Sequence, residues 1–182
     1  MKKISFRNDV LPLKNEIYRL ALRITLNPAD AEDVVQETMI KVWSRRERWD
    51  EIESMEAFCL TICRNIALDK MRKMENQNPS LERLRIGDFS SEIEEHDTPD
   101  LSYASNPEEQ AMQHDRIALI RRLIERLPEK QRSIMQLRET EGKSYKEIAA
   151  IMDISEEQVK VNLFRARQTI KQRYIETENY GL

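Results

Sequence analysis

The stretch from Ser155 to about Ile175 carries side chains that suit the recognition of DNA bases. At 100° per residue of an α-helix, one face of it is apolar and is expected to lie in a core; it consists of Val159, Leu163, Ala166 and Ile170. The opposite face offers an arginine, which can bind guanine bidentately, beside apolar groups that can touch thymine methyls, and cations on one flank can hold phosphates. The candidate DNA-contacting residues are Lys160, Val161, Phe164, Arg165, Arg167 and Lys171. A basic surface helix of a bundle would have the same composition, so this pattern alone leaves both interpretations open.

A second candidate site lies on a helix expected from Ser54 to about Met74. One stripe of this otherwise apolar helix is rich in polar groups and consists of Phe58, Thr61, Arg64, Asn65, Leu68 and Arg72. Single-stranded DNA suits such a stripe, because an aromatic ring can stack on a base, an amide can bind its edge and arginines can hold the backbone. The alternative is a face that only contacts solvent.

A third candidate site lies on the helix expected from about Ala29 to Arg46. Ala31, Val35, Thr38 and Val42 stack on its buried side. The other side is charged and polar around one apolar residue; it carries Asp30, Asp33, Gln36, Glu37 and Ile40. We expect this face to have no use inside a domain of three or four helices, which favours a partner protein, although solvation is the common fate of such charges.

Helix-capping signals place these residues on defined elements. An amphipathic helix is expected between Leu11 and Ile24, ending at Asn27-Pro28. Further helices are expected from Pro107 to about Leu127 and from Pro128 to about Thr140. Ser144 and Ser155 each begin a capping box, for helices 144–152 and 155–175. Only Asp153, Ile154 and Ser155 separate these two helices, which is the spacing of a helix-turn-helix.

The composition favours an all-α protein. Only three of the 182 residues are glycine, which leaves little material for hairpin turns or phosphate-binding loops. The two cysteines, Cys59 and Cys63, lie four residues apart in an apolar helical stretch and are expected to be core residues of a protein from a reducing compartment. No apolar run approaches the roughly 20 residues of a membrane span, and the N-terminus lacks the apolar core of a signal peptide, so we expect a cytoplasmic protein without direct membrane insertion.

Charge is unevenly distributed and predicts two small helical domains joined by an acidic linker. Residues 1–74 carry 14 Lys and Arg against 12 Asp and Glu, residues 75–109 carry 2 against 10, and residues 110–182 carry 14 against 11. The middle stretch also contains several Pro and Ser residues and no sustained apolar period. We therefore expect domains at 1–74 and 110–182, and a flexible linker at 75–109.

Three segments resemble the extracytoplasmic-function (ECF) sigma factors of the sigma-70 class. Leu127 to Gln172 resembles region 4 in its framework: LP-x-x-x-R, G-x-S-Y-x-E-I-A, I-S-x-x-x-V-K and RAR. DAEDVVQETMIKVW, from Asp30 to Trp43, resembles region 2 where it docks on RNA polymerase. FCLTICRNIALDKMRK, from Phe58 to Lys73, resembles the following segment, which opens and recognises the −10 promoter element.

This resemblance implies a bacterial transcription initiation factor that binds core RNA polymerase and directs it to promoters. The helix after Ser155 would recognise the −35 element, the stripe on helix 54–74 would recognise and melt the −10 element, and the face of helix 29–46 would bind polymerase. The implied partners are the beta-prime clamp and beta flap of core polymerase, promoter DNA, and an anti-sigma protein, often anchored in the membrane. The linker, with a net charge of −8, would lie in the basic channel that RNA later occupies. Val161 and Asn162 depart from the family pattern after the Val-Lys pair, so the family's −35 base preference does not transfer.

Other function classes explain less of the sequence. A helix-turn-helix regulator that acts without polymerase would leave the Asp30–Trp43 and Phe58–Lys73 matches unexplained. For an enzyme, His96 and His114 are the only histidines, and neither a metal-ligand spacing nor a nucleophile-base pair can be assembled; we expect no catalysis and no cofactor or metal. A purely helical scaffold would not require two capped helices at a three-residue turn.

Overall fold

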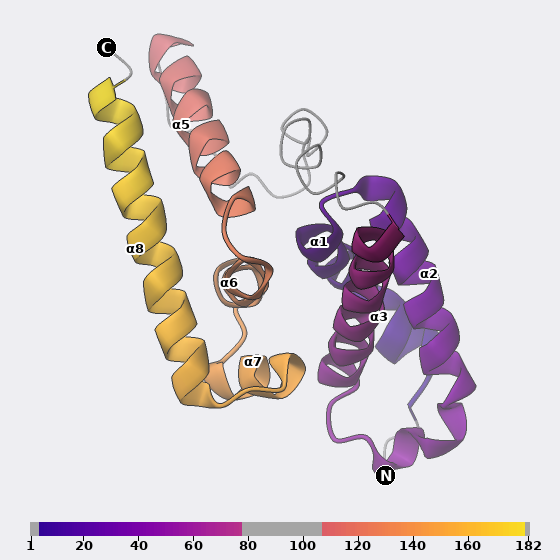
Figure 1. Cartoon of the computed structure of the whole chain (residues 1–182). Helices are drawn as coiled ribbons and strands as arrows, with labels where there is room; N and C mark the ends of the chain where they lie inside the picture. The colour runs from indigo at the N-terminus through magenta and orange to yellow at the C-terminus, as the bar shows by residue number, and fades with distance from the viewer. Residues whose placement is uncertain (1–3, 78–106, 181–182) are drawn as a thin grey trace.

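The computed structural model describes residues 4–77 and 107–180, and every regular element in these two ranges is helical (Figure 1), which confirms the all-α prediction. The N-terminal unit, residues 4–77, contains α1 (Lys14–Thr25), α2 (Pro28–Ser44) and α3 (Met55–Gln77). The C-terminal unit, residues 107–180, contains α5 (Pro107–Glu125), α6 (Glu129–Met135), α7 (Tyr145–Met152) and α8 (Glu156–Tyr180). Short π or 3-10 helices complete the units: η1 (Phe6–Val10), η2 (Leu11–Leu13), η3 (Arg46–Glu51) and η5 (Gln136–Thr140).

The junction of α1 and α2 is fixed by an amide cap and a proline. The side chain of Asn27 accepts a 3.0 Å hydrogen bond from the backbone N–H of Asp30, and Pro28 occupies the first turn, where no N–H is required. Leu26 has a φ of 51° in the left-handed region and ends α1 with a hydrogen bond to the carbonyl of Leu22. The predicted break at Asn27-Pro28 is therefore confirmed.

Apolar residues of all three helices form the core of the N-terminal unit, which includes Ile17, Leu20, Ile24, Val35, Val42, Leu60 and Ile66. Cys59 and Cys63 lie in this core, as expected, and burial raises the pKa of each thiol to about 12. At one end, Phe6, Trp43 and Trp49 pack their rings together with centroids 5.4–6.4 Å apart. The indole N–H of Trp49 donates to the carbonyl of Val42 at 3.1 Å, which satisfies the one polar atom of this buried ring.

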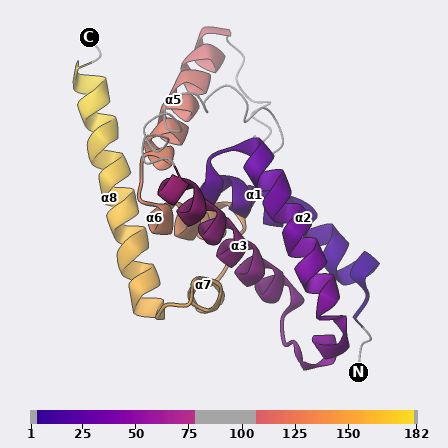
Figure 2. The same cartoon turned by 45° about the vertical axis from the view of Figure 1, so that its right-hand side comes forward.

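In the C-terminal unit, α8 packs against α5, α6 and α7 (Figures 1 and 2). The interior is formed by Leu123, Leu127, Ile134, Leu137, Ile148, Ile151, Met152, Val159, Leu163 and Ala166. The expected helix 128–140 is in fact α6 followed by the wider π turn η5, because the N–H of Glu141 bonds to the carbonyl of Gln136 at 3.1 Å. The last helix continues to Tyr180 rather than Ile175, since no proline or glycine interrupts the chain between Gly142 and Gly181.

The two units are in contact. Helix α7 packs against α3, and α6 packs against α1 (Figure 2). Most of the proposed linker, residues 78–106, lies outside the described residues, so the domain boundaries at 1–74, 75–109 and 110–182 stay predictions. Within the described ranges, no helix is both long enough and apolar enough to cross a membrane.

Candidate nucleic-acid and polymerase interfaces

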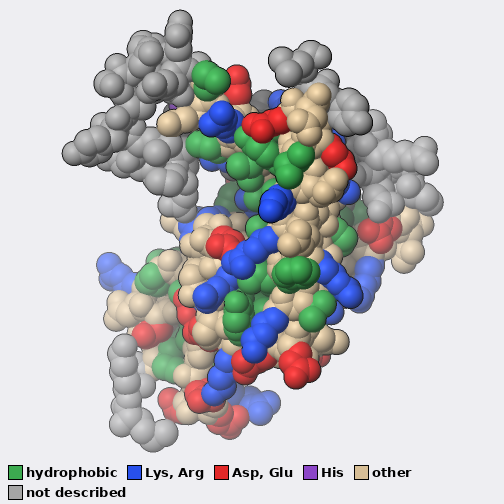
Figure 3. All heavy atoms as spheres, turned by 90° about the vertical axis from the view of Figure 1, so that its left-hand side faces the viewer, with side chains coloured by type: hydrophobic (Ala, Val, Ile, Leu, Met, Phe, Trp, Pro, Cys, Tyr) green, Lys and Arg blue, Asp and Glu red, His purple; other side chains and the backbone are tan. Residues whose placement is uncertain are grey.

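Helix α8 has one buried and one exposed face. Val159 and Ala166 are fully buried, Leu163 is nearly so, and Ile170 is half-buried. Opposite them, Phe164 is 63% exposed and Val161 is 45% exposed, unusual values for large apolar side chains. The side of the molecule that α8 occupies shows Lys and Arg side chains gathered around apolar ones (Figure 3). The predicted division into two faces is confirmed.

Hydrogen bonds at both capping boxes fix where α7 and α8 begin. The hydroxyl of Ser144 accepts from the N–H of Glu147 at 3.2 Å. The Glu147 carboxylate accepts from the hydroxyl of Ser144 at 2.7 Å and from its backbone N–H at 2.8 Å, and these two bonds lower the pKa of Glu147. Ser155 and Gln158 make the same reciprocal pair at 3.2 Å in both directions. Between them, Asp153 takes a left-handed φ of 53°. The helix-turn-helix is thus built by local side-chain contacts.

An aromatic ring holds two cations beside the turn. The guanidinium of Arg138 lies 5.0 Å and the ammonium of Lys160 lies 5.8 Å from the ring centroid of Tyr145, the first residue of α7. Arg138 also donates to the carbonyl of Lys143 at 2.8 Å. These contacts concentrate positive charge beside the turn of the helix-turn-helix.

The exposed arginines of α8 differ in how they are held. Arg167 is fixed by Glu139, whose carboxylate lies 2.5 Å from its guanidinium. Arg165 and Lys171 are exposed and have no side-chain hydrogen bond or ion pair to any residue that the structure describes. Of these three cations, Arg165 and Lys171 are thus the ones free to meet a ligand without first losing a partner.

The stripe on α3 is only partly accessible. Asn65 and Arg72 are exposed, and within ranges 4–77 and 107–180 the one ion pair of Arg72 is a 3.8 Å contact with Asp69. Phe58 and Leu68 are half-buried and pack against the core. The two apolar members of the stripe, Phe58 and Leu68, thus also stabilise the fold.

Two polar members of the stripe are also half-buried. The hydroxyl of Thr61 donates to the carbonyl of Ala57 at 2.7 Å. The Nε atom of Arg64 is inaccessible and has no hydrogen-bond partner among the residues that the structure describes. A buried donor without an acceptor costs free energy, so Arg64 gains if a binding event provides one.

Arg132, in the LP-x-x-x-R sequence that begins at Leu127, holds the end of α5. Its guanidinium donates to the carbonyls of Leu127 at 2.6 Å and Glu125 at 3.2 Å, and also to the carbonyl of Arg23 on α1 at 3.1 Å. The residue is 8% exposed, and burial lowers its pKa, although the guanidinium remains a full set of donors. Arg132 therefore has a structural role that explains its place in the sequence framework.

Comparison with known proteins assigns both units. Residues 10–76 match the family model described as Sigma-70 region 2, and residues 117–170 match that described as Sigma-70, region 4. The ECF RNA polymerase sigma-E factor of Escherichia coli K12 is 32% identical over 143 residues, covering 78% of this chain and 72% of that protein. This chain belongs to the ECF sigma factors. As a member of this family, it is a transcription initiation factor.

Other relatives extend this picture. A protein from Xanthomonas campestris described as a probable RNA polymerase sigma factor RfaY is 26% identical over 167 residues; the match covers 92% of this chain but only 40% of that protein. Among solved structures, the sigma factor RpoE from Bartonella quintana, crystallised with the anti-sigma factor NepR, has a TM-score of 0.67 and 22% identity. That match covers 94% of this chain and 96% of the other, and it supports the fold of the sigma factor across both units.

One sequence expectation about the sigma factor is wrong. The face of α2 was expected to have no internal use, yet the ammonium of Lys70 on α3 lies 3.2 Å from Asp30 and 2.8 Å from Asp33. These two carboxylates therefore hold α2 to α3. Gln36, Glu37 and Ile40 remain exposed, Ile40 by 68%, and Glu37 pairs only with Lys41 one turn away, at 3.2 Å.

Sequence reasoning also missed residues that position the cations of α8, namely Arg138, Glu139 and Tyr145. The position of Tyr145 could have been predicted from the sequence, because a residue directly after the capping serine Ser144 must lie at the start of the helix. Glu139 carried none, since its pairing with Arg167 joins elements 28 residues apart.

Proposed function

We propose that the two units divide promoter recognition, α8 contacting the −35 element and α3 the −10 element, while α2 docks on core polymerase. The observation that carries the proposal is the exposed apolar and cationic face of α8 beside a fully capped helix-turn-helix. Exposed apolar side chains that lie together and are rimmed by polar or charged groups, as Val161 and Phe164 do, mark interaction sites. Base edges and thymine methyls in the major groove provide a partner for such a site.

At the −35 element, Arg165 would contact a base edge and Val161 and Phe164 would contact methyl groups, while Lys160, Arg167 and Lys171 would contact phosphates. The proposed base contacts are supported by the exposure of their side chains on α8. The proposed phosphate contacts are supported by their position on the flank of the same helix. At the −10 element, Asn65 and Arg72 would make the main polar contacts, and Phe58, Thr61 and Arg64 would join them after a local rearrangement of their half-buried side chains.

On polymerase, the beta-prime clamp would contact Gln36, Glu37 and Ile40, with Asp30 and Asp33 held in place by Lys70. Region 4 would contact the beta flap. An anti-sigma protein is proposed as a further partner, in keeping with the NepR complex of the Bartonella RpoE. We further propose that the protein acts in the cytoplasm, by binding alone and without catalysis.

Reconstituted transcription with core polymerase tests this function. The protein is added to core enzyme with fragments of its own genome, and transcript 5′ ends are mapped. We expect new transcripts whose upstream sequences share two elements, and we expect Arg165→Ala to reduce them. Specific DNA binding without any polymerase-dependent transcript would instead indicate a regulator that acts without polymerase, and the proposal would fail.

A further inference from the structure

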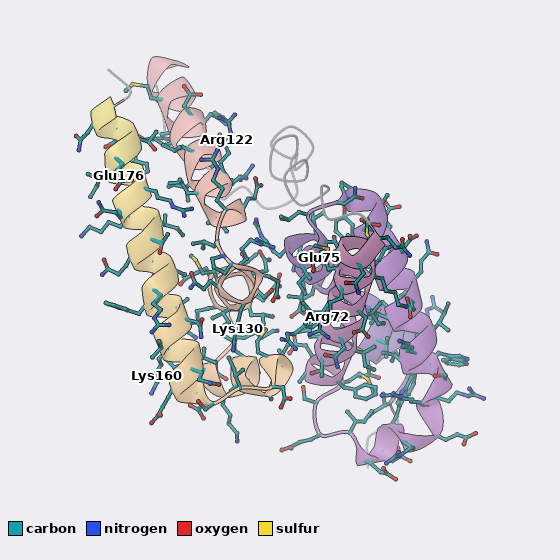
Figure 4. The ribbon with its side chains drawn as sticks, viewed as in Figure 1. Arg72, Glu75, Arg122, Lys130, Lys160 and Glu176 are labelled. Carbon is teal, nitrogen blue, oxygen red and sulfur yellow. The ribbon has the colours of Figure 1, made fainter. Side chains whose placement is uncertain are left out.

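The first turns of α8 carry an exposed carboxylate on the face that we propose enters the major groove. Glu157 and Val161 are one turn apart, so at 100° per residue they lie about 40° from each other, opposite the buried Val159. Side chains four residues apart on a helix are neighbours, with Cβ atoms about 5–6 Å apart. Lys160 lies between them in the sequence, near the end of α8 that adjoins α7 (Figure 4). A carboxylate and an isopropyl group are thus presented side by side.

The other polar side chains around this pair are already held within the protein. Gln158 accepts from the backbone N–H of the capping serine at 3.2 Å, and the amide of Asn162 donates to the carbonyl of Gln158 at 2.7 Å. The ammonium of Lys160 lies over the ring of Tyr145. In contrast, Glu157 makes no hydrogen bond or ion pair with any residue that the structure describes.

The stability of α8 does not require Glu157. An acid in the first turn stabilises the positive end of the helix dipole, but Glu156 provides the same charge in the same turn, and Ser155 already caps the helix. A carboxylate on a surface that meets DNA also loses water on binding, which is costly unless a hydrogen-bond donor replaces that water. The position of Glu157 therefore favours a donor on the DNA.

Cytosine provides such a donor next to the place where a methyl group can lie. In the major groove, cytosine presents its N4 amine as a donor, whereas thymine presents the O4 acceptor beside its C5 methyl group. A carboxylate accepts from the cytosine amine but has no proton to donate to thymine O4. 5-Methylcytosine combines the amine and the methyl group on adjacent ring carbons, C4 and C5. This combination matches a carboxylate and an isopropyl group one helical turn apart.

We propose that Glu157 and Val161 together bind a 5-methylated cytosine in the −35 element, so that cytosine methylation strengthens promoter binding by this sigma factor. This inference rests on the proposed contact between α8 and the −35 element. Val161 is also one of the two positions at which the helix departs from the family pattern, so the preference follows from residues of this chain. Burial of one methyl group against Val161 predicts about fourfold tighter binding.

Modified bases test the inference after holoenzyme has selected the element. Core polymerase with the full-length chain selects from promoter duplexes randomised in the −35 region, and each cytosine of the selected element is then replaced by 5-methylcytosine or by thymine. We expect one cytosine at which methylation raises the affinity of wild-type holoenzyme about fourfold. At that position thymine, which has the methyl group but no amine, should bind about fivefold or more less tightly than 5-methylcytosine.

Two variants assign the two parts of the base. Val161→Ser should abolish the gain from methylation. Its matched control is Ile175→Ser, because Ile175 is 43% exposed against 45% for Val161 and lies about 21 Å further along α8. Glu157→Gln should keep the gain from methylation but reduce the preference for 5-methylcytosine over thymine to below about twofold, since an amide can also donate to thymine O4. Glu156→Gln, about 100° around the helix from Glu157, should keep the wild-type preference.

The outcomes separate this inference from the proposed function. A specific −35 element in which no cytosine binds more tightly when methylated would overturn the inference and leave the −35 contact of α8 intact. A methylation gain that survives Val161→Ser, or a wild-type preference over thymine in Glu157→Gln, would overturn the assignment to these residues. Holoenzyme that selects no −35 sequence would overturn both proposals. Both side chains are exposed, so the variants should fold, which circular dichroism checks.

Discussion

The ammonium of Lys70 on α3 lies 2.8 Å from the carboxylate of Asp33 on α2. It also lies 3.2 Å from Asp30, so a single lysine of α3, the helix proposed to contact DNA, holds two carboxylates of α2, the helix proposed to contact polymerase. Although burial alone would lower it, hydrogen bonds to the two carboxylates raise the pKa of Lys70, which keeps it charged at neutral pH. The two candidate interfaces of the N-terminal unit are therefore mechanically linked.

Reversing the charge of Glu37 should weaken polymerase binding without harming the fold. Glu37 is exposed and loses only its pair with Lys41, which contributes about 0.2–0.5 kcal/mol. We expect Glu37→Lys to reduce core polymerase affinity about fivefold or more in moderate salt, and Asp33→Lys with Glu37→Lys to reduce it further. Affinity is measured by co-purification and titration with core enzyme. A double variant that binds as the wild type does would show that the docking face is misassigned.

Lys70→Met tests whether Lys70 positions the carboxylates of Asp30 and Asp33 for polymerase binding. This change leaves Asp30 and Asp33 present but removes the cation between them, so their side chains should repel and reorient. We expect polymerase affinity to fall about two- to fivefold while secondary structure is kept. An unchanged affinity would mean that Lys70 serves stability alone.

Asn65→Ala should impair promoter opening. Asn65 is exposed on α3 and packs against nothing in the core, so its loss should leave stability and polymerase binding unchanged. The loss of an amide contact to a base predicts a fall of about three- to tenfold in open complex. Permanganate footprinting on the −10 region measures this, and a normal footprint would remove Asn65 from the site. Phe58→Ala should give a similar defect, but Phe58 also packs on the core, so it is the less selective probe.

Replacement of Arg132 should destabilise the protein. Its guanidinium satisfies the carbonyls of Arg23, Glu125 and Leu127. Arg132→Met keeps most of the apolar contact but leaves buried acceptors unpaired, which predicts a loss of about 2–4 kcal/mol in the free energy of unfolding. Urea denaturation monitored by circular dichroism measures it, with the exposed Arg126→Met as control. A loss below about 0.5 kcal/mol would contradict the capping role.

Limited proteolysis tests the boundaries proposed from composition. The acidic segment 75–109 should be cut first, because its composition does not support a packed core, and two folded fragments should result. A single resistant core that includes 75–109 would contradict the two-domain plan.

The helix-turn-helix could be predicted because its determinants are local. Ser144 with Glu147 and Ser155 with Gln158 are neighbours in sequence, so their capping bonds follow from spacing. The contacts between the two units could not be predicted in this way, such as the two hydrogen bonds that the guanidinium of Arg19 donates to the carboxylate of Glu141, at 2.6 and 2.7 Å. Arg19 and Glu141 are 122 residues apart, and each has the sequence context of an ordinary surface charge. The ion pairs of Lys70 with Asp30 and Asp33 could not be predicted for the same reason, because the sequence around a lysine does not indicate which distant carboxylates it will contact.

Substitutions of Arg165 and Lys171 should affect DNA binding in different ways, because Arg165 lies at the centre of the exposed side of α8 and Lys171 lies on its flank. Both are exposed and have no side-chain partner among the described residues, so neither substitution should unfold the helix. Arg165→Ala should cost about 1–3 kcal/mol on the preferred −35 sequence and much less on others, because a guanidinium that binds a base edge carries specificity. Lys171→Ala should weaken binding to all sequences alike and reduce the slope of log affinity against log salt by about one, because it removes one phosphate contact.

Both variants are measured as holoenzyme, with core polymerase and the full chain, across a salt series and a set of single-base changes in the −35 element. Arg167→Ala provides the matched comparison, because Arg167 is an arginine of the same helix that Glu139 already holds. Its removal should change affinity less than that of Arg165, since part of its charge is neutralised before DNA binds. Equal losses on every −35 variant for Arg165→Ala would make Arg165 a phosphate contact. Val161 and Phe164 would then remain candidates for base recognition, with Lys160 as a candidate in place of its proposed phosphate contact; all three side chains are exposed.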